Sequence, residues 1–443
     1  MLSKLFNIYR PAPFTKPLPK EEVDSAYSKY RLQVMLTIFW GYAGFYLVRS
    51  NFAMAKPYLI KELGYTTGDL GLIATGLSVA YGISKFVMGS VSDRSNPRYF
   101  MGTGLILSGL SNIFITKLHS VPLMFLVWFV NGWFQGMGWA PCARILTHWF
   151  SDRERGTKFA IWNVAHNVGG GLVGPLCTFA LFLYASWTSL FYVPALVSMA
   201  MGVLIVLFLR DTPQSVGLPS IEEYKNDYPE TGVTDREKEM SAREIFFEHV
   251  FNNRALWILA FANLFVYVVR YGVVNWAPTY LTQVKGCTGS GARWLFSIYE
   301  YAGIPGMLVA GWMTDRFFNG RRGPVGVFYM IVVTASVMVY WLNPPGHYYV
   351  DMAALAMAGF FIYGPVMLVG VAAVDLVPKK AAGTAAGLTG LFGYVGGATI
   401  AELGIGKTVQ LYGWNWGFVI VVASSVMAVA LLALTWHAHE RNA

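Results

Sequence analysis

The stretch Phe45-Tyr46-Leu47-Val48-Arg49 places an arginine deep inside an apolar segment, and a matching stretch, Val266-Tyr267-Val268-Val269-Arg270, recurs in the second half of the chain. A charged side chain at the centre of a bilayer costs ~2.5–3.5 kcal/mol on insertion scales. Because the chain keeps one such charge in each of two equivalent places, we expect both arginines to be functional. An anion held between two pseudo-symmetric halves is the simplest use for them.

The composition is that of a membrane protein. Hydrophobic residues make up 55% of the chain and charged residues only 13%, and the mean hydropathy is +0.46, whereas soluble domains are ~25% charged. Apolar stretches long enough to cross a hydrocarbon core recur throughout. They predict twelve spans, at about 32–55, 68–91, 99–117, 121–146, 157–184, 188–209, 255–282, 292–316, 324–343, 349–374, 382–406 and 413–436.

The distribution of Lys and Arg predicts the orientation, since short cytoplasmic loops carry an excess of both. One set of alternate connections is rich in them, whereas the opposite set shows little more than Lys56, Lys61, Lys117, Lys285, Arg293 and Lys407. We therefore expect both termini in the cytoplasm. This topology accounts for most of the net charge of +9, so no nucleic-acid partner is expected.

Two features of the ends and the cysteines limit other interpretations. Residues 1–31 mix charges with prolines and lack the apolar core of a signal peptide. The three cysteines have neither metal-ligand spacing nor the pattern of a disulfide framework. We expect no metal site.

The chain reads as two six-span halves joined by a polar linker. Gly89-Ser90-Val91-Ser92-Asp93-Arg94 ends the second span, and Gly311-Trp312-Met313-Thr314-Asp315-Arg316 ends the eighth. Parallel repeats of six spans are the architecture of the major facilitator superfamily. The predicted fold is therefore an all-α membrane protein with twelve transmembrane helices in two pseudo-symmetric bundles. Its predicted parts are a cytoplasmic N-terminal segment, the first half, the linker, the second half and a cytoplasmic tail, at 1–31, 32–209, 210–254, 255–436 and 437–443.

The two matched loops are candidates for a cytoplasmic latch. In each, a glycine lets two helices approach closely, and an aspartate can cap a helix or pair with an arginine. The alternative is that these charges only serve orientation, which is harder to accept for two matched loops than for one. The predicted latch consists of Asp93, Arg94, Arg98, Asp315, Arg316 and Arg322.

Helical spacing groups polar residues around the two arginines. Residues three and four apart share a face, so Tyr42 and Tyr46 lie on the face of Arg49, and Asn263 and Tyr267 lie on that of Arg270. Glu300 is the obvious acid nearby, and one carboxylate cannot neutralise both guanidiniums. Lys85 adds a further cation, so the core carries excess positive charge that an anion would balance. Guanidinium can bind a phosphate through two parallel hydrogen bonds.

Other residues of the predicted cavity are weaker candidates, because a single polar or aromatic side chain in a membrane helix more often packs than binds. His166 lies three residues after Asn163 on a helix of small residues, and a neutral imidazole could take up a proton when a phosphate arrives. Tyr81 lies one turn before Lys85 and faces the same way. Trp139, Tyr363 and Tyr394 are plausible aromatic residues of the cavity wall.

The chain resembles the organophosphate:phosphate antiporters, and most closely the bacterial glycerol-3-phosphate transporters, which implies a place in the inner membrane of a bacterium. The resemblance covers nearly the whole length. The motifs that carry it most strongly are Gly41-Tyr42-Ala43, Ser84-Lys85-Phe86, Trp133-Phe134-Gln135-Gly136-Met137-Gly138-Trp139, Ala165-His166-Asn167-Val168-Gly169-Gly170-Gly171, Tyr299-Glu300-Tyr301-Ala302-Gly303-Ile304-Pro305-Gly306 and Ile362-Tyr363-Gly364-Pro365.

The resemblance implies exchange of an external small organophosphate for internal inorganic phosphate by rocker-switch alternating access. It also implies that Arg49 and Arg270 clamp the phosphate. The implied cavity is lined by Lys85, His166, Tyr42, Tyr46, Tyr81, Gln135, Trp139, Asn163, Tyr267, Tyr363 and Tyr394. The hexose-phosphate branch of the family tends to carry an acid and a lysine where this chain has Ala386 and Thr389, which favours the smaller glycerol-3-phosphate.

Two positions depart from the family pattern. Glycerol-phosphate members usually have Lys directly after the first arginine and Asp five residues after the second, whereas this chain has Ser50 and Asn275. The paired loss suggests that an ion pair between the halves has become a neutral hydrogen bond, which places Ser50, Asn275 and Glu300 among the expected gating residues. Glu402 is an additional acid to which the sequence assigns no role.

The sequence leaves three alternative functions to consider. A transporter-like sensor of sugar phosphates would have a similar cavity and differ only in not exchanging phosphate. A proton-coupled symporter would be expected to carry carboxylates on its path, and this path is mainly cationic. An enzyme is not expected, since the sequence shows no nucleophile–base constellation and no nucleotide loop. We expect no cofactor, and we expect the protein to function as a monomer in the lipid bilayer.

Overall fold

The computed structural model describes residues 8–92, 94–227, 245–377 and 382–436. The elements of the first half are α2 (Lys20–Leu47), α3 (Asn51–Leu63), α4 (Thr67–Ser92), α5 (Pro97–Ile115), α6 (Val121–Gln135), α7 (Trp139–Trp149), α8 (Asp152–Asn163), α9 (Ala165–Tyr184) and α10 (Ser189–Phe208). All elements in the described part of the chain are helical, which confirms the predicted class.

The linker and the second half follow the same pattern. Two short elements, η1 (Pro213–Val216) and α11 (Ile221–Lys225), belong to the linker. The second half contains η2 (Ile245–Phe251), α13 (Arg254–Val274), α14 (Ala277–Gln283), α15 (Gly289–Phe317), α16 (Arg322–Leu342), α17 (Tyr348–Asp375), α18 (Ala382–Leu391), η4 (Phe392–Ala398), η5 (Ile400–Gly404), α19 (Ile405–Tyr412) and α20 (Trp414–Leu434).

Each of the twelve predicted spans lies in these helices, but several spans are not single straight helices. The first is broken between α2 and α3, the fourth between α6 and α7, and the fifth between α8 and α9. The eleventh runs through two π-helical segments, η4 and η5. Single π-turns inserted in α-helices often mark functional positions, because they re-aim the side chains around them.

By length and composition, seven helical stretches of the described chain are apolar enough to cross a membrane: Arg153–Tyr184, Ser189–Phe208, Arg254–Val274, Arg322–Leu342, Tyr348–Asp375, Thr384–Tyr412 and Trp414–Leu434. The remaining predicted spans are not among these seven stretches of the described chain. α4 contains Lys85, and α15 contains both Arg293 and Glu300.

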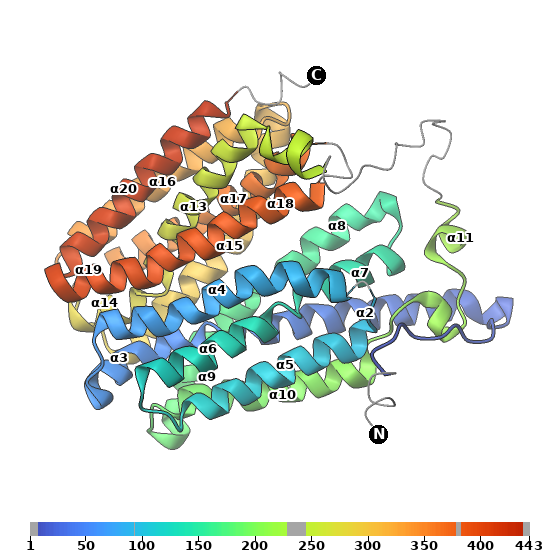
Figure 1. Ribbon diagram of the computed structural model, residues 1–443, viewed down its shortest axis with the longest axis horizontal. Helices are drawn as coiled ribbons and strands as arrows, with labels where there is room; N and C mark the ends of the chain where they lie inside the picture. The colour runs from blue at the N-terminus through green and yellow to red at the C-terminus, as the bar shows by residue number, and fades with distance from the viewer. Residues whose placement is uncertain (1–7, 93, 228–244, 378–381, 437–443) are drawn as a thin grey trace.

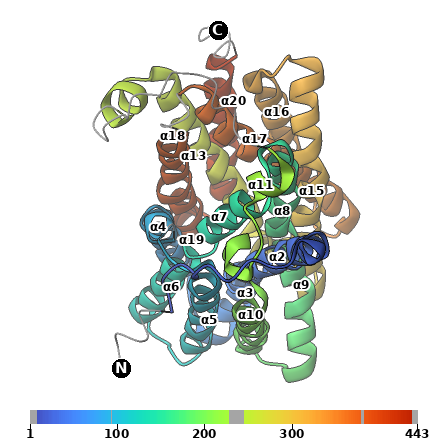
Figure 2. The same cartoon turned by 90° about the vertical axis from the view of Figure 1, so that its right-hand side faces the viewer.

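The helices of the two halves form two neighbouring bundles, with α2–α10 in one and α13–α20 in the other (Figures 1 and 2). We call the end of the molecule that carries α11 the linker end, and the opposite end, where α3, α14 and α19 lie, the far end. Residues 210–227 pack against the first bundle, where Tyr27 stacks on Tyr224 at 3.9 Å between ring centroids and donates a hydrogen bond to the Pro219 carbonyl.

The two bundles are joined in the middle and at the far end. A β-carbon at Gly71 of α4 would overlap the Glu402 carbonyl oxygen, and one at Gly174 of α9 would overlap the Arg293 carbonyl oxygen, so glycine allows backbone contact at both crossings. At the linker end, a cavity of about 560 Å³ lies beside Gly89 and the α7 residues Trp139–His148. In the described chain, the hydrogen bonds between the bundles lie away from this end. The described hydrogen bonds thus close the molecule in the middle and at the far end, and the cavity at the linker end is lined by residues of the first bundle.

Candidate functional site

The break after α2 places Arg49 and is held by buried amides. Where the helix ends, the Val48 carbonyl loses its helical partner, and a buried carbonyl without a hydrogen bond is costly. Here it accepts from Asn112 Nδ2 at 2.8 Å and from Asn131 Nδ2 at 2.9 Å. Asn51, the first residue of α3, donates in turn to Asn112 Oδ1 and to the Leu190 carbonyl. The asparagines therefore fix the backbone on both sides of Arg49.

Gln135 also stabilises the end of α2. Its Nε2 donates to the Phe45 carbonyl at 3.1 Å, one turn before the break, and its side chain is buried. Asn131 and Gln135 are four residues apart on α6, so one face of that helix braces the end of α2. The resemblance implies that Gln135 lines the cavity, whereas its hydrogen bonds in the structure are to backbone and to Asn131.

Arg270 lies four residues before the end of α13, with only 3% of its surface exposed. Its guanidinium donates to the Tyr363 hydroxyl at 3.3 Å, and that hydroxyl donates to Glu300 Oε2 at 2.5 Å. Tyr363 thus stands between the arginine and the acid that the sequence suggested as its partner. Glu300 is held further by Asn167 of α9, whose Nδ2 donates to the Glu300 carbonyl at 3.0 Å.

The two arginines converge on one tyrosine that the sequence analysis missed. Arg49 donates to the Tyr271 hydroxyl at 2.7 Å, and the Arg270 guanidinium carbon lies 4.9 Å from the centre of the same ring. The spacing held a signal, because Tyr271 is four residues after Tyr267 and therefore shares its face. One arginine from each half faces a common point between the bundles.

Aromatic rings rather than acids surround this point. The Arg49 guanidinium carbon lies 4.7 Å from the ring centre of Tyr46, 4.9 Å from that of Tyr81 and 5.9 Å from that of Tyr394. Ring faces attract cations weakly but carry no charge to cancel them. Among the described residues, no carboxylate lies within ion-pair distance of either arginine. Neither guanidinium therefore has a carboxylate as a direct partner, and the one acid nearby, Glu300, cannot compensate both charges.

His166 lies just after the break between α8 and α9, on the wall of the same space. Its ring centre is 5.9 Å from that of Tyr46 and 5.5 Å from that of Tyr363, so it bridges the two halves. Asn163, on the other side of the break, donates to the sulfur of Met307 at 3.4 Å. Both residues thus reach the second bundle.

The remaining predicted wall residues form two aromatic groups. Tyr42 contacts Tyr46 and Trp162, and Trp162 contacts Trp139, whose ring centre is 5.0 Å from the Lys85 ammonium. Tyr267 contacts Tyr394 at 5.1 Å between ring centres, and Tyr394 contacts Tyr81 at 4.7 Å. The second group crosses between the halves. Trp139 also borders the cavity at the linker end, so Lys85 lies between that cavity and the arginines.

A second, small cavity of about 40 Å³ lies on the far side of the arginines. Its lining includes Arg49, Ser50, Lys56, Asn275 and Glu402, and its volume is that of a few water molecules. Asn275 Nδ2 donates to Glu402 Oε1 at 2.6 Å, so the described partner of Asn275 is an acid rather than Ser50, which borders the same cavity.

The structure corrects the placement of three basic residues. Lys56, Lys285 and Arg293 counted as charges of one set of loops, whereas all three are buried, with Lys56 in α3 and Arg293 in α15. Each has partners elsewhere in the protein. Lys56 pairs with Glu402 at 2.7 Å, Lys285 pairs with Asp351 at 3.4 Å, and Arg293 donates to Tyr58 and Thr178. Composition and loop counting could not reveal these contacts, because the partners are far apart in the sequence.

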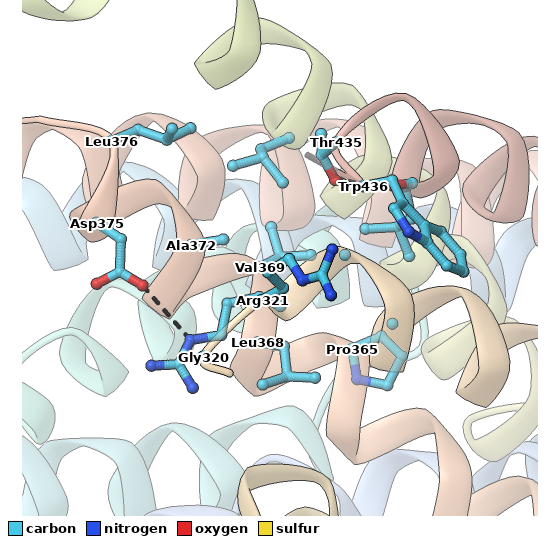
Figure 3. A pocket seen from close by; sticks show the side chains of 15 residues that line it. Gly320, Arg321, Pro365, Leu368, Val369, Ala372, Asp375, Leu376, Thr435 and Trp436 are labelled. Carbon is cyan, nitrogen blue, oxygen red and sulfur yellow. Dashed lines mark hydrogen bonds and ion pairs between the residues drawn. The ribbon is translucent and has the colours of Figure 1, made fainter. Parts of the chain in front are cut away.

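The predicted latch is only partly assembled. Arg322 lies 3.4 Å from both Asp315 and Asp375, and the second pair borders a cavity at the linker end of the second half (Figure 3). Arg98 donates to the Val206 carbonyl of α10, whereas Arg94 and Arg316 are exposed. Asp93 lies outside the described residues. No group of three or more His, Cys, Asp or Glu residues in the described ranges could hold a metal.

Comparisons with known proteins agree with this geometry. The family model described as Major Facilitator Superfamily matches residues 38–401. The chain is 54% identical to the glycerol-3-phosphate transporter of Bacillus subtilis, over 99% of each chain. It is 42% identical to a probable hexose phosphate transport protein of Chlamydia muridarum, covering 98% of this chain and 97% of that one. The membrane sensor protein UhpC of Salmonella typhimurium is 39% identical, with 95% and 96% covered.

A solved structure shares the fold. A bacterial homologue of the human lysosomal transporter Spinster, in an inward-facing and unoccupied conformation, superposes with a TM-score of 0.71 at 15% identity, over 93% of this chain and 98% of that one. The relatives and the family model cover the length on which both halves and the paired arginines lie. The chain therefore belongs to the major facilitator superfamily of membrane transporters, in the family that contains these glycerol-3-phosphate transporters.

Proposed function

We propose that this protein exchanges external glycerol-3-phosphate, or a similar small organophosphate, for internal inorganic phosphate by rocker-switch alternating access. The observation that carries the proposal is the pair of uncompensated guanidiniums, Arg49 and Arg270, that face Tyr271 from opposite halves. A phosphate oxygen can accept from each guanidinium, which would balance the charge and pull the halves together.

The rest of the wall supports a phosphate ester. Lys85 and His166 offer further donors at the two sides of the arginines, and Tyr42, Trp139 and Trp162 provide a surface against which the carbon part can pack. Tyr363 and Asn167 keep Glu300 hydrogen-bonded and out of ion-pair distance of Arg270, so the acid does not take the place of the substrate. The cavity at the linker end then provides access from the cytoplasm.

The smaller substrate is favoured by the eleventh span. Thr389 is buried, and its carbonyl accepts from Asn263 Nδ2 at 2.7 Å, so this position secures α18 to α13. Ala386 has no polar side chain. Neither residue supplies the charges that the hexose-phosphate branch carries there. The relatives named as glycerol-3-phosphate transporters support the same choice, and we propose no cofactor and a monomeric working unit.

The orientation that we propose for the protein in the membrane rests on the loops at the linker end. The loops at the linker end carry most of the exposed Lys and Arg, so we place this end and both termini in the cytoplasm and the protein in the inner membrane. On this placement the structure is inward-facing. The segments at 1–31, 32–209, 210–254, 255–436 and 437–443 are then a cytoplasmic segment, two membrane halves with their cytoplasmic linker, and a cytoplasmic tail.

The test is counterflow of [³²P]phosphate in proteoliposomes loaded with phosphate, with external glycerol-3-phosphate, glucose-6-phosphate or phosphoenolpyruvate as competitor. We expect phosphate exchange with glycerol-3-phosphate as the strongest competitor. Stronger competition by glucose-6-phosphate would favour a hexose-phosphate antiporter. Binding of a sugar phosphate without any exchange would favour a sensor, the role named for one relative, and would contradict the proposal.

A further inference from the structure

The first observation is a buried ion pair that joins the two halves. Lys56 Nζ of α3 lies 2.7 Å from Glu402 Oε2 of η5, and their side chains are 1% and 5% exposed. The ammonium also donates to the Asn275 carbonyl at 3.2 Å and lies 3.6 Å from the centre of the Trp276 ring. The ammonium of Lys56 therefore makes three contacts with the second half.

The acid is held equally firmly from its own half. Asn275 Nδ2 donates to the second oxygen of Glu402, and Trp276 Nε1 donates to the Ala401 carbonyl at 2.9 Å. The carbonyl of Glu402 itself lies against Gly71 of α4. The π-helical segment η5 is thus fixed on three sides, and it presents its carboxylate to the first half.

The short helix α3 also carries the neighbouring contact. Tyr58 is two residues after Lys56, which places the two side chains about 200° apart around the helix axis. The Tyr58 hydroxyl accepts from Arg293 of α15 at 3.0 Å, and Arg293 also donates to Thr178 of α9 at 2.8 Å. One helix of the first half is therefore tied to the second half on both faces, at the far end of the molecule.

The location of the pair links it to the arginines. Lys56 and Glu402 share the small cavity of about 40 Å³ with Arg49 and Ser50, and α3 follows directly after the break that positions Arg49. Opening the far end would separate α3 from η5 and place the two charges in water. Closing it buries both charges, and a buried charge is tolerated only with its partner.

We propose that the Lys56–Glu402 ion pair, with Asn275, is the outer gate of this transporter, formed when the far end is closed and broken when it opens. Ser50 and Asn275 occupy the positions where glycerol-phosphate members of the family usually carry a charged pair, whereas the charges of this chain lie at residues 56 and 402. Only the expected effect of this gate on exchange depends on the proposed transport function. Its effect on conformation can be measured without substrate.

The test is a distance measurement across the far end by electron paramagnetic resonance. Spin labels are attached at Lys61→Cys on α3 and Lys407→Cys on α19, both exposed, in protein whose Cys142, Cys177 and Cys287 are replaced by alanine. Substrate-free protein in lipid nanodiscs should give mainly the short distance of the closed far end. Lys56→Met and Glu402→Gln should each shift the ratio of long to short distances by at least about tenfold, since each leaves a buried charge unpaired.

A double variant separates loss of the gate from general damage. Lys56→Met with Glu402→Gln leaves no unpaired charge, so it should shift the distances less than the sum of the two single variants. If the shift of the double variant equals the sum of the two single shifts, Lys56 and Glu402 do not act as a pair. Should a single variant fail to fold, the double variant still provides the test, because the proposal requires it to differ from the parent in its ratio of long to short distances.

A matched control is available in the same part of the molecule. Lys285 and Asp351 form an equally buried pair, each 1% exposed, within the second half. Lys285→Met and Asp351→Asn should leave the distance distribution unchanged even if they lower stability. The gate is overturned if Lys56→Met and Glu402→Gln leave the distribution unchanged, or if the control variants shift it as much. Phosphate exchange plays no part in this measurement, so its outcome is independent of the proposed substrate.

Discussion

At the residue scale, the two arginines differ from any other basic side chain in the site. Arg49 and Arg270 each have a tyrosine hydroxyl as partner and no acid in the described chain. A guanidinium can give a phosphate two parallel hydrogen bonds, whereas an ammonium acts as a point charge. The choice of arginine at both positions therefore concerns geometry as well as charge.

Arg49→Lys and Arg270→Lys should each lower phosphate exchange by at least about tenfold, because a hydrogen bond to a charged group is worth about 1.5–3 kcal/mol. The measurement is [³²P]phosphate counterflow in proteoliposomes with equal amounts of inserted protein. Arg153→Lys is the control, since Arg153 is 85% exposed and pairs with Asp227, away from the site. Exchange within twofold of the parent in either site variant would argue against a double guanidinium clamp.

Ser50 and Asn275 offer a second residue-scale test. Ser50→Lys adds an unpaired cation beside Arg49 and should reduce exchange strongly, since an unpaired buried charge costs several kcal/mol. Asn275→Asp alone should also be harmful, because the residue lies 2.6 Å from Glu402. Together the two changes introduce a new pair and should recover part of the exchange rate.

The measurement for this pair is a double-mutant cycle on exchange, with expression checked for each variant. Losses that add without recovery would show that positions 50 and 275 do not interact. In the structure the Asn275 amide donates to Glu402. The neutral hydrogen bond expected between Ser50 and Asn275 therefore stays a prediction.

At the element scale, the helices could be predicted from the apolar stretches of the sequence, but the breaks in these helices could not. Apolar length predicts a helix that spans the membrane. It cannot predict that α2 stops at Leu47, because the break is compensated by Asn112 and Asn131 from other helices. It also could not predict the π-helical segments that carry Tyr394 and Glu402. The residues that face one another across the halves depend on these breaks.

The break can be tested directly. Asn131→Leu keeps the size of the side chain and leaves the Val48 carbonyl with one partner fewer, which should cost about 1–3 kcal/mol of stability and lower exchange further by displacing Arg49. Thermal unfolding in detergent and counterflow would measure the two effects. Ser198→Ala is the control, since Ser198 donates to the Gly44 carbonyl within the regular part of α2. Equal effects of both variants on exchange would show that the break has no special role.

At the scale of the whole molecule, the internal repeat predicted the arrangement well. Two similar arginine motifs and two similar glycine–aspartate–arginine motifs indicated two bundles. The all-helical fold of this superfamily is confirmed. The sequence could group candidate residues on faces, and the structure brings Tyr46, Tyr81, Tyr267 and Tyr394 together around the arginines. Contacts between the halves were out of reach, because Lys56 and Glu402 are far apart in the chain and their pairing depends on the docked bundles.

The proposed orientation is tested by labelling single cysteines in whole cells. Lys61→Cys at the far end should react with a membrane-impermeant maleimide added outside. Thr157→Cys in α8 and Thr15→Cys in the N-terminal segment, both exposed, should react only after the cells are opened. Reaction of Thr157→Cys in intact cells would reverse the placement of the linker and both termini.

The uncompensated charge of the two arginines also has an electrical consequence. A site with two positive charges that binds a divalent phosphate is neutral, so its reorientation should not respond to membrane voltage. The empty site keeps both charges, and moving them outward against an inside-negative potential costs up to about 2.3 kcal/mol per charge per 100 mV. Outward return of the empty carrier, which must follow each cycle of net uptake, would then be slowed by voltage, whereas exchange would not. Imposing an inside-negative potassium diffusion potential with valinomycin should leave counterflow unchanged and suppress net uptake, and equal voltage dependence of the two would contradict this.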